Sequence, residues 1–576
     1  MKIRTSVVEK NVVLLPVCAL MLLWLFKTGS AETIVFGGGS GSLSWDDQYS
    51  EVTVIDFETN PGFIQPSQNG PEDNISLKLL QRGGVITSPN AKVVLELSQS
   101  NLDKELRKMV DGRNQAFEIK VPSATGIILR FDLGERFGVN RIRFFPREGF
   151  DQYFLRGYEI SLNDGSAEQL TLFGSPDMRL FRTVERNVDP MVDIALPLQF
   201  VRYIEIKQLV RGEWEIDEFE IFGQGFASSA EYVSNVFDQG RPAVFGEILF
   251  AKEVIGEPTK VGVTLSTRSG TTSDPKDSTE WSVWSPPYPA GVATEITSPA
   301  PRQYWQFKVN MQSSEILSAV TVDSLAIEVS PALADSVLGE IWPQSAIIGQ
   351  DTELTYTVKS FNSRGFDRLE IETLAPVDVV SSVQVDGLDV EYEKTDIDGG
   401  VQIGFPKISG NSTLRLAFEG IALQYNTVFA GRVFNSQDPE ELPQRVTAGN
   451  AADDSLALGD DLSVSILVAK NLIHFLEAVP VPFTPNGDDV NDVATITYDI
   501  ANLTSGTPVS VKVFDLTGRL RRVVHAGLDA SGRYTRDWDG KDDNEQMLAP
   551  GIYLVCVEVE ADTGSESKTA IVPLVY

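Results

Sequence analysis

The chain has 576 residues, a length that predicts about three to five domains. Hydrophobic residues make up 42% of it and aromatic residues 9%, enough for sizeable cores, so a disordered or collagen-like chain is excluded. The 48 Lys and Arg against 81 Asp and Glu give a net charge of −33. Because phosphate contacts need clustered cations, this balance excludes nucleic acid as the main partner.

The first 31 residues have the pattern of a signal peptide. Lys2, Arg4 and Lys10 form a basic region, and an almost wholly apolar run follows from Val12 to Phe26. That run is about 15 residues long, shorter than the roughly 20 that a membrane-spanning helix needs. Small residues up to Ala31 then frame a cleavage site. We therefore expect an exported bacterial protein, with an uncleaved membrane anchor as the alternative.

Hydrophobic residues beyond the signal alternate with polar ones almost everywhere, as in Leu129-Arg-Phe-Asp-Leu133. This period of two predicts an all-β protein of tandem antiparallel sandwiches, a jelly roll followed by fibronectin-like or Ig-like domains. One short helix is expected over residues 102–110, since Leu102, Leu106 and Met109 share a face. The breaks in the pattern predict these boundaries: signal peptide 1–31, lead-in 32–74, and β domains 75–224, 226–330, 337–470 and 480–576.

Five short motifs mark the first of these domains, and they occur in the order typical of one family. Residues 75–224 resemble a discoidin, or F5/8 type C, domain of the galactose-binding-like class. The resemblance implies an eight-stranded jelly roll whose loops bind glycans or lipid headgroups, often with a structural calcium ion. The motifs are MVDGRNQAF (109–117), ILRFDLG (128–134), VNRIRF (139–144), VRYIEI (201–206) and WEIDEFEIFG (214–223).

Four residues in turn-like stretches of this domain are candidate ligand contacts: Arg147, Phe150, Tyr153 and Trp214. Loops at one end of a sandwich hold such side chains in place, aromatic faces suit sugar rings, and the guanidinium fork binds hydroxyls and carboxylates. The alternative is that the four residues only pack the loops onto the sandwich.

The discoidin resemblance also implies a calcium site. The positions that match the family's metal-binding pattern are Asp111, in the Asp-Gly loop, and Glu218, in the last strand. Arg113 fills the family's next acidic position, and a cation there argues against a bound metal.

The two middle domains carry little chemistry. Residues 226–330 resemble a fibronectin-like or laminin-G-like sandwich, and residues 337–470 an Ig-like domain. Trp281 and Trp284 have the spacing seen in thrombospondin type 1 repeats, but the cysteines of those repeats are missing. We expect no Trp–Arg ladder either, and we expect the two rings on opposite faces of a strand.

The last domain, residues 480–576, resembles FlgD-type Ig-like domains. The same pattern recurs in gliding-motility and type IX secretion C-terminal domains. The resemblance implies that this domain serves surface delivery, through secretion or attachment machinery. The motifs that carry it are FTPNGDDVND (483–492), VFDLTGR (513–519), WDGKDDN (538–544) and APGIY (549–553).

The first of these motifs clusters side-chain oxygens, from Asn486, Asp488, Asn491 and Asp492. Oxygen ligands are what calcium prefers, although the spacing is not that of an EF-hand. An Asx-turn network is an equal alternative.

An enzyme is not expected. The only histidines, His474 and His525, lie in or beside the last domain without the partners of a catalytic triad or a zinc site. We therefore expect a secreted or cell-surface protein that binds a carbohydrate or cell-surface polymer. A structural surface or matrix component and a glycoside hydrolase with accessory modules remain the alternatives.

Overall fold

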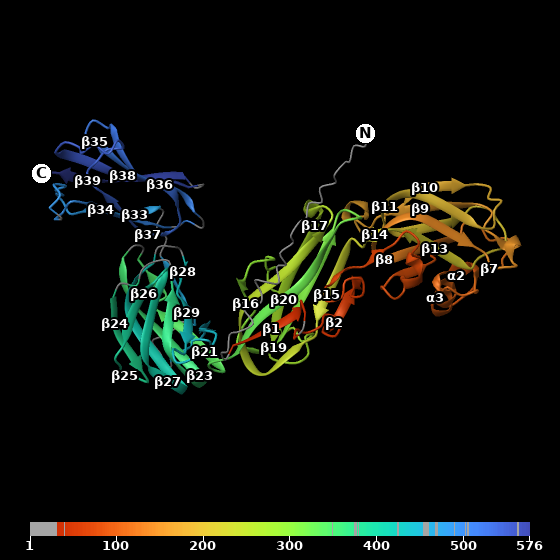
Figure 1. The fold of residues 1–576 in the computed structure, drawn as a ribbon, viewed down its shortest axis with the longest axis horizontal. Coiled ribbons are helices and arrows are strands. Elements are labelled where there is room, and N and C mark those ends of the chain that lie inside the picture. The colour runs from red at the N-terminus through yellow and green to blue at the C-terminus, as the bar shows by residue number, and fades with distance from the viewer. Residues whose placement is uncertain are drawn as a thin grey trace, which may run out of the picture. The chain divides into compact units, whose positions relative to one another are not determined.

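The computed structural model describes residues 31–39, 41–347, 350–373, 377, 379–422, 426–452, 460–466, 471–488, 490–501, 503, 506–561 and 564–576. The expected signal peptide therefore lies, apart from Ala31, outside the described residues. Two compact units contain them: Glu32–Arg241 with Phe245–Val329, and mainly Ser330–Tyr576. Strands dominate both units, which confirms the all-β prediction (Figure 1). No helix in the described ranges is long and apolar enough to cross a membrane.

The first sandwich covers residues 75–223 and buries one continuous hydrophobic core. Its larger sheet has the order β10-β9-β11-β8-β13, with β6 beside β8, and a β7–β12 pair forms the second layer. The strands are β6 (Val85–Thr87), β7 (Phe117–Ile119), β8 (Ile128–Phe145), β9 (Tyr158–Asn163), β10 (Arg179–Val184), β11 (Val192–Gln208), β12 (Trp214–Ile216) and β13 (Glu218–Gly223).

The expected helix is present as α3 (Gln99–Arg107), followed by a 3-10 turn over Lys108–Val110. The Ser98 hydroxyl caps it by accepting a hydrogen bond from the Asn101 N–H. Leu102 and Leu106 are fully buried, as their spacing predicts. A short helix α2 (Ala91–Val94) precedes α3, and 3-10 turns lie at Ile75–Lys78, Asp151–Tyr153, Ala167–Gln169 and Pro258–Lys260.

The second β domain is built on an eight-stranded sheet of order β1-β20-β16-β19-β15-β2, with β17 beside β19 and β18 beside β16. Two of its strands precede the first sandwich in the chain, so that sandwich is an insertion between β2 and β15. The strands are β1 (Glu32–Gly37), β2 (Tyr49–Thr53), β15 (Ser229–Ser234), β16 (Phe237–Ile255), β17 (Val261–Gly270), β18 (Thr294–Glu295), β19 (Arg302–Ser313) and β20 (Ala319–Pro331).

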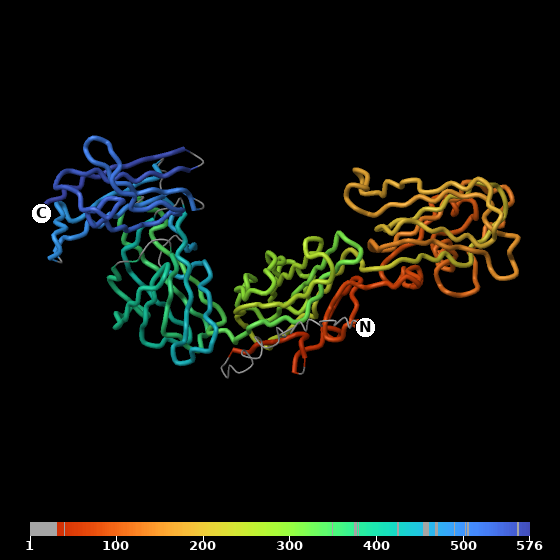
Figure 2. The backbone as a smooth tube through the Cα atoms, turned by 45° about the horizontal axis from the view of Figure 1, so that its top comes forward, coloured from red at the N-terminus to blue at the C-terminus, as the bar shows by residue number. Residues whose placement is uncertain are grey.

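The prediction of a lead-in over residues 32–74 is therefore wrong for β1 and β2, which are strands of the second β domain. Strand β1 pairs with β20 from Glu32 opposite Val329 to Gly37 opposite Ser324, and Figure 2 shows the red N-terminal segment alongside the green strands. Glycine is needed at Gly37 because φ is +66° and a Cβ atom there would lie 2.1 Å from the Asp323 carbonyl oxygen. The glycine-rich stretch thus begins at a close packing contact.

The chain crosses between the first two β domains twice, and the two connecting segments run side by side. They meet as the antiparallel pair β5 (Gln68–Asn69) and β14 (Gly225–Phe226), close to the small pair β3 (Ile55–Asp56) and β4 (Gln65–Pro66). The Glu135 carboxylate of the first sandwich accepts hydrogen bonds from the hydroxyls of Ser228 (2.9 Å) and Ser229 (2.7 Å). The junction is therefore held by side chains as well as by the backbone.

The prediction that Trp281 and Trp284 lie on opposite faces of a strand, without a Trp–Arg ladder, is also wrong. The Arg268 guanidinium lies 5.3 Å from the ring centre of Trp281 and 4.4 Å from that of Trp284, and the Lys308 ammonium lies 4.9 Å from Trp284. The segment is not a regular strand, and its spacing of three residues places both rings on the same cation. The N–H groups of Ser282 and Ser285 bond to the backbone of β17, so this ladder covers the free edge of that strand.

The third β domain pairs a nine-stranded sheet with a three-stranded one around a separate core. The first has the order β25-β24-β27-β23-β21-β31, with β26 beside β27, β29 beside β23 and β30 beside β29, and the second β22-β32-β28. The strands are β21 (Ser336–Trp342), β22 (Ser345–Ala346), β23 (Asp351–Glu372), β24 (Val379–Val385), β25 (Leu388–Asp389), β26 (Glu393–Ile397), β27 (Gly400–Ile421), β28 (Asn426–Val428), β29 (Ala430–Phe434), β30 (Gln444–Arg445), β31 (Thr447–Ala448) and β32 (Ser463–Ile466).

The final domain is a two-layer sandwich of sheets β33-β34-β37 and β36-β35-β38-β39 around its own core. It begins at β33, seven residues before the expected boundary at 480, because β33 pairs with β34 along its whole length. The strands are β33 (Ile473–Val479), β34 (Ala494–Ile500), β35 (Thr507–Asp515), β36 (Leu520–Asp529), β37 (Gly532–Trp538), β38 (Gly551–Ala561) and β39 (Gly564–Leu574).

Candidate functional site

A pocket lies at the end of the first sandwich where β8 stops. Pro146 follows Phe145 and has no N–H to continue the strand ladder, so the chain leaves the sheet there. The backbone N–H of Asp217 donates to the Phe145 carbonyl oxygen at 2.8 Å, which holds the start of β13 beside the end of β8. The cavity has a volume of about 430 Å³.

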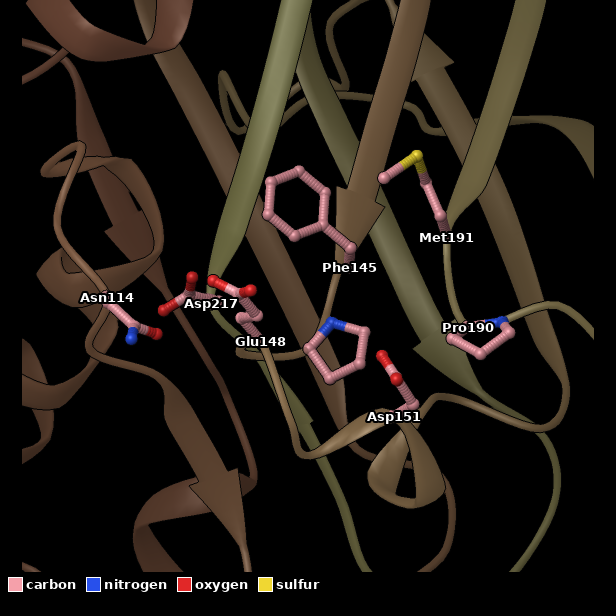
Figure 3. A pocket seen from close by; sticks show the side chains of 8 residues that line it. Asn114, Phe145, Glu148, Asp151, Pro190, Met191 and Asp217 are labelled. Atoms are coloured by element: carbon pink, nitrogen blue, oxygen red, sulfur yellow. The ribbon is translucent and has the colours of Figure 1, made fainter.

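Figure 3 shows Asn114, Asp217 and Glu148 on one side of Phe145, and Pro190 and Met191 on the other. Asp151 and Pro146 complete the lining. Phe145 is half-buried and Met191 is 56% exposed, so they offer apolar surface to a bound molecule. The pocket thus combines apolar walls with a few polar groups, the usual composition of a small-molecule site.

Arg147 is held by carboxylates and is not free to bind a ligand. Its Nε and Nη2 atoms lie 3.0 and 2.6 Å from the two oxygens of Glu215, and Nη2 also bonds to Glu118. These hydrogen bonds, with that to Glu215 the largest contribution, raise the pKa of Arg147. Arg147 therefore fixes the loop after β8 to strands β7 and β12.

The aromatic candidates divide into one core residue and two loop residues. Trp214 is 4% exposed, lies in strand β12 and packs against Phe117 at 5.9 Å between ring centres. Trp214 therefore belongs to the core, in agreement with the alternative that this residue only packs. Phe150 is 41% exposed and covers the Arg147 guanidinium at 4.4 Å, with Tyr153 beside it at 6.4 Å. These two residues flank Asp151 in the chain, next to the pocket.

The expected calcium residues lie close to this site. Glu218 is 7% exposed, and its carboxylate faces the backbone N–H groups of Gly112 and Arg113. Burial raises the pKa of Glu218 to about 7, and the nearby charges of Asp111 and Asp217 add to the rise, while the backbone N–H groups of Gly112 and Arg113 partly oppose it. A buried carboxylate beside other carboxylates fits a cation, and the Arg113 side chain is exposed to solvent.

The described residues include no group of three or more His, Cys, Asp or Glu side chains arranged for a metal. Asp111 and Glu218 would therefore need backbone oxygens and water to complete the six to eight ligands of calcium. Asp111 is exposed, and one of its oxygens accepts the Arg113 N–H at 2.9 Å.

The oxygens of the last-domain loop bond to the loop's own backbone. Asn486 accepts the N–H of Asp488, Asp488 that of Val490, and Asp492 that of Gly487, at 2.8 to 3.0 Å. Asn491 adopts a positive φ of 57°, a conformation that asparagine tolerates better than most residues. This is the Asx-turn alternative, and calcium at these four residues stays a prediction.

Sequence reasoning missed the pocket's own residues. Asp217 directly precedes Glu218, but only Glu218 matched the family's metal-binding pattern. Glu148 and Asp151 lie on either side of Phe150 in the chain. Nothing in the sequence distinguishes them from the other acidic residues, which number 81 in all. The one available signal was Pro146, which closely follows the motif VNRIRF (139–144) and has no N–H with which to continue a strand.

Comparison with known proteins identifies the last domain. Residues 478–574 match the CHU_C type IX secretion signal domain, which confirms the expectation of a type IX C-terminal domain. No curated protein matches the chain.

Solved structures similar to part of the chain are carbohydrate-binding modules. One is the module CpGH89CBM32-5 from Clostridium perfringens in complex with GalNAc-β-1,3-galactose, with 16% identity over 25% of this chain and 99% of that one and a TM-score of 0.19. Another is a fucose binding module from Streptococcus pneumoniae, with 16% identity over 29% and 100% and a TM-score of 0.20. A third is the family 32 module of NanJ from C. perfringens in complex with galactose, with 17% identity over 25% and 96% and a TM-score of 0.19.

The fold and the matched domain define a class: an exported bacterial protein built from tandem β-sandwiches. Its C-terminal domain is a type IX secretion signal, so the protein is secreted or displayed at the cell surface.

Proposed function

We propose that this protein is a secreted or surface-displayed carbohydrate-binding protein, in which the inserted first sandwich holds the glycan. The observation that carries the proposal is the pocket at the end of β8, with Phe145 and Met191 as apolar walls and carboxylates beside them. Apolar surface of this kind suits the C–H faces of a sugar ring, while carboxylates accept hydrogen bonds from hydroxyls. The other domains would carry the pocket and deliver it.

We infer binding without catalysis. Neither histidine lines the pocket: the ring of His474 bonds to the Asn471 carbonyl oxygen at 2.9 Å, and His525 lies 3.3 Å from Asp529. Both belong to the last domain, so the pocket would work without an imidazole base.

A glycan array probed with the chain from Glu32 to Tyr576 tests the proposal. The matched variants are Asn114→Trp, which places a large ring at the pocket, and Leu172→Trp, which adds the same ring to a fully exposed position outside the pocket lining. We expect sugar binding that Asn114→Trp abolishes and Leu172→Trp preserves. The proposal fails if no glycan binds, or if both variants behave alike.

The same samples separate the alternatives. Release of reducing ends from a bound oligosaccharide would identify an enzyme. Calcium-dependent self-association without any effect of sugar would identify a structural surface component.

We further propose that Asp111 and Glu218 contribute to a calcium site that supports the loop beside the pocket. The metal would neutralise the buried Glu218 carboxylate and tie the loop at residues 111–113 to β13. Calcium should then raise the unfolding temperature of the wild-type chain but not that of Glu218→Gln. An equal shift in both proteins would place the metal elsewhere.

A further inference from the structure

The outer face of the four-stranded sheet in the last domain carries a line of apolar side chains. The pairing register places Phe514 of β35 opposite both Leu520 of β36 and Leu554 of β38, and it places Leu554 opposite Ile571 of β39. Directly opposite residues of an antiparallel pair lie on the same face of a sheet. Each of the four strands therefore contributes one large apolar side chain to this line, and we call these four residues the apolar row.

The apolar row faces away from the core of the domain. Val513 and Val555, the strand neighbours of its two central members, are fully buried, and successive side chains of a strand point to opposite faces. At the ends of the row, Leu520 is 43% exposed and Ile571 is 61% exposed. The row is thus open to solvent, although folding of the domain does not need it, since the valines of the inner face already form the core.

The rest of the same face has the ordinary composition of a solvated sheet. Four residues along β35 from Phe514, the corresponding line of opposite residues consists of Ala526, Ser510, Glu558 and Ser567. Polar residues are what an antiparallel sheet with one solvated face normally presents there. The apolar row departs from this pattern, and contiguous exposed apolar surface on a folded protein marks an interaction site.

The size of the apolar surface argues for a transient contact. The row crosses three strand spacings, about 14 Å, and Ile552 (46% exposed) and Val523 (36% exposed) extend the surface along the strands to about 13 Å. The resulting area of about 200 Å² is well below the roughly 800 Å² per partner of a standard stable interface. A protein that binds this surface can therefore also release it.

Charge argues against a second copy of the chain as the partner. No member of the row is charged, and the ion pair between Lys512 and Glu558 beside it is neutral overall. The whole chain carries a net charge of −33, so two copies repel each other, and the small apolar surface would have to overcome that repulsion. The row instead fits a different protein that presents an uncharged apolar surface.

We propose that the apolar row is the surface by which a protein of the type IX export route holds the last domain. Residues 478–574 match a type IX secretion signal domain, and a signal of this kind has to be bound during export and released afterwards. A small, uncharged and apolar contact provides both steps. This inference does not depend on the proposed carbohydrate binding.

Export of the full chain from a bacterium with a type IX secretion system tests the proposal. The double variant Leu520→Thr with Ile571→Thr removes the exposed ends of the row and keeps the β-branched side chains that strands favour. We expect the fraction of the protein that protease reaches on whole cells to fall at least fivefold, with the remainder retained in the cell envelope. Leu528→Thr is the matched control, since Leu528 lies on the same strand and face, is 71% exposed and is outside the row; its export should stay within about twofold of wild type.

Measurements on the purified chain from Glu32 to Tyr576 separate recognition from misfolding. The changed positions are exposed, so the unfolding temperature of the last domain should stay within about 4 °C of wild type. If it falls further in the double variant, Ile571→Thr alone, at the most exposed position of the row, takes its place and should reduce export at least twofold. Leu520→Met with Ile571→Val keeps the surface apolar and should be exported like wild type.

Four results would overturn the proposal. The first is normal export of a folded variant that lacks the apolar ends, and the second is an equal loss of export in Leu528→Thr. The third is a loss of export in Leu520→Met with Ile571→Val, because the apolar character would then not be what the partner binds. The fourth is a dimer, detected by sedimentation of the purified chain, that the double threonine variant dissociates, because a second copy would then occupy the row.

Discussion

Phe36 should be one of the most sensitive positions of the second β domain, although it stands five residues from the expected cleavage site. Its ring is fully buried. Four aromatic rings surround it, with centres at 4.9 Å (Phe307), 5.3 Å (Phe237), 5.8 Å (Trp45) and 6.4 Å (Trp305). The substitution Phe36→Ala removes the ring from the centre of this cluster.

The expected cost is about 3–5 kcal/mol in the free energy of unfolding, the range for truncating a buried phenylalanine. Neighbouring rings cannot close the gap easily, because Trp305 and Phe307 lie on one strand, β19, whose backbone pairs with β15 and β17. A β domain is stable by only about 5–15 kcal/mol, so this change removes a large fraction of the total.

Native-state hydrogen exchange measures the loss by domain. In the chain from Glu32 to Tyr576, amides of β20, the partner of β1, should lose about 3–5 kcal/mol of protection. Amides of β38 in the last domain should not change, which provides an internal reference. Glu51→Ala, an exposed position on β2, is the control and should stay within about 0.5 kcal/mol of wild type.

The reasoning is refuted if β20 amides in Phe36→Ala lose less than about 1 kcal/mol, against the range expected for a buried ring. Residues 32–74 would then behave as the expected flexible lead-in, and the pairing of β1 with β20 would contribute little.

Three further predictions follow from the site and the domain boundaries. In EDTA, the free energy of unfolding of the first sandwich should fall as pH rises from 4.5 to about 7, because the folded state holds the Glu218 proton more tightly than the unfolded state does. Calorimetry should show a loss of up to about 3 kcal/mol in the wild-type chain and no such loss in Glu218→Gln. A free energy of unfolding that rises with pH over this range would contradict the prediction. Arg268→Gln should lower the protection of β17 amides by about 1–2 kcal/mol, since it removes the cation from two tryptophan rings, whereas no change would mean that the ladder is only a surface contact. Deletion of residues 471–576 should leave glycan binding intact but abolish surface retention, measured by protease digestion of whole cells; a truncated protein still found at the surface would disprove the role of this domain.

Local patterns in the sequence were sufficient to predict several strands and the helix α3. The alternation around Leu129 and Leu133 indicated a strand because the pleat turns every second side chain inward, and both residues are buried in β8. The helix at Leu102 and Leu106 followed from spacing in the same way. Such signals need only a few neighbouring residues.

Pairing across long stretches of chain could not be read in this way. Strand β1 finds its partner β20 almost 300 residues later, and nothing in Glu32–Gly37 names that partner. The glycines after it have the composition of a linker, yet Gly37 is a packing position. Similarly, the prediction that Trp281 and Trp284 lie on opposite faces assumed a regular strand. The backbone there is irregular, and both rings contact the Arg268 guanidinium.

The candidate site was only partly predictable for a related reason. The turn-like stretches of the sequence suggested Arg147 and Trp214 as ligand contacts, but the structure uses these residues for an ion pair and for the core. Asp217 attracts no notice in a chain with so many acidic residues. Only the fold reveals that it is buried and lies at a pocket.

The insertion of the first sandwich into the second has a mechanical consequence. A polymer held by the first sandwich and pulled away from the cell loads two polypeptide crossings at once, and these run side by side as β5 and β14. A protease that cuts one crossing leaves the sandwich attached through the other. A domain joined in series by a single linker would be lost at the first cut, so the inserted arrangement suits a protein that works outside the cell among proteases and shear.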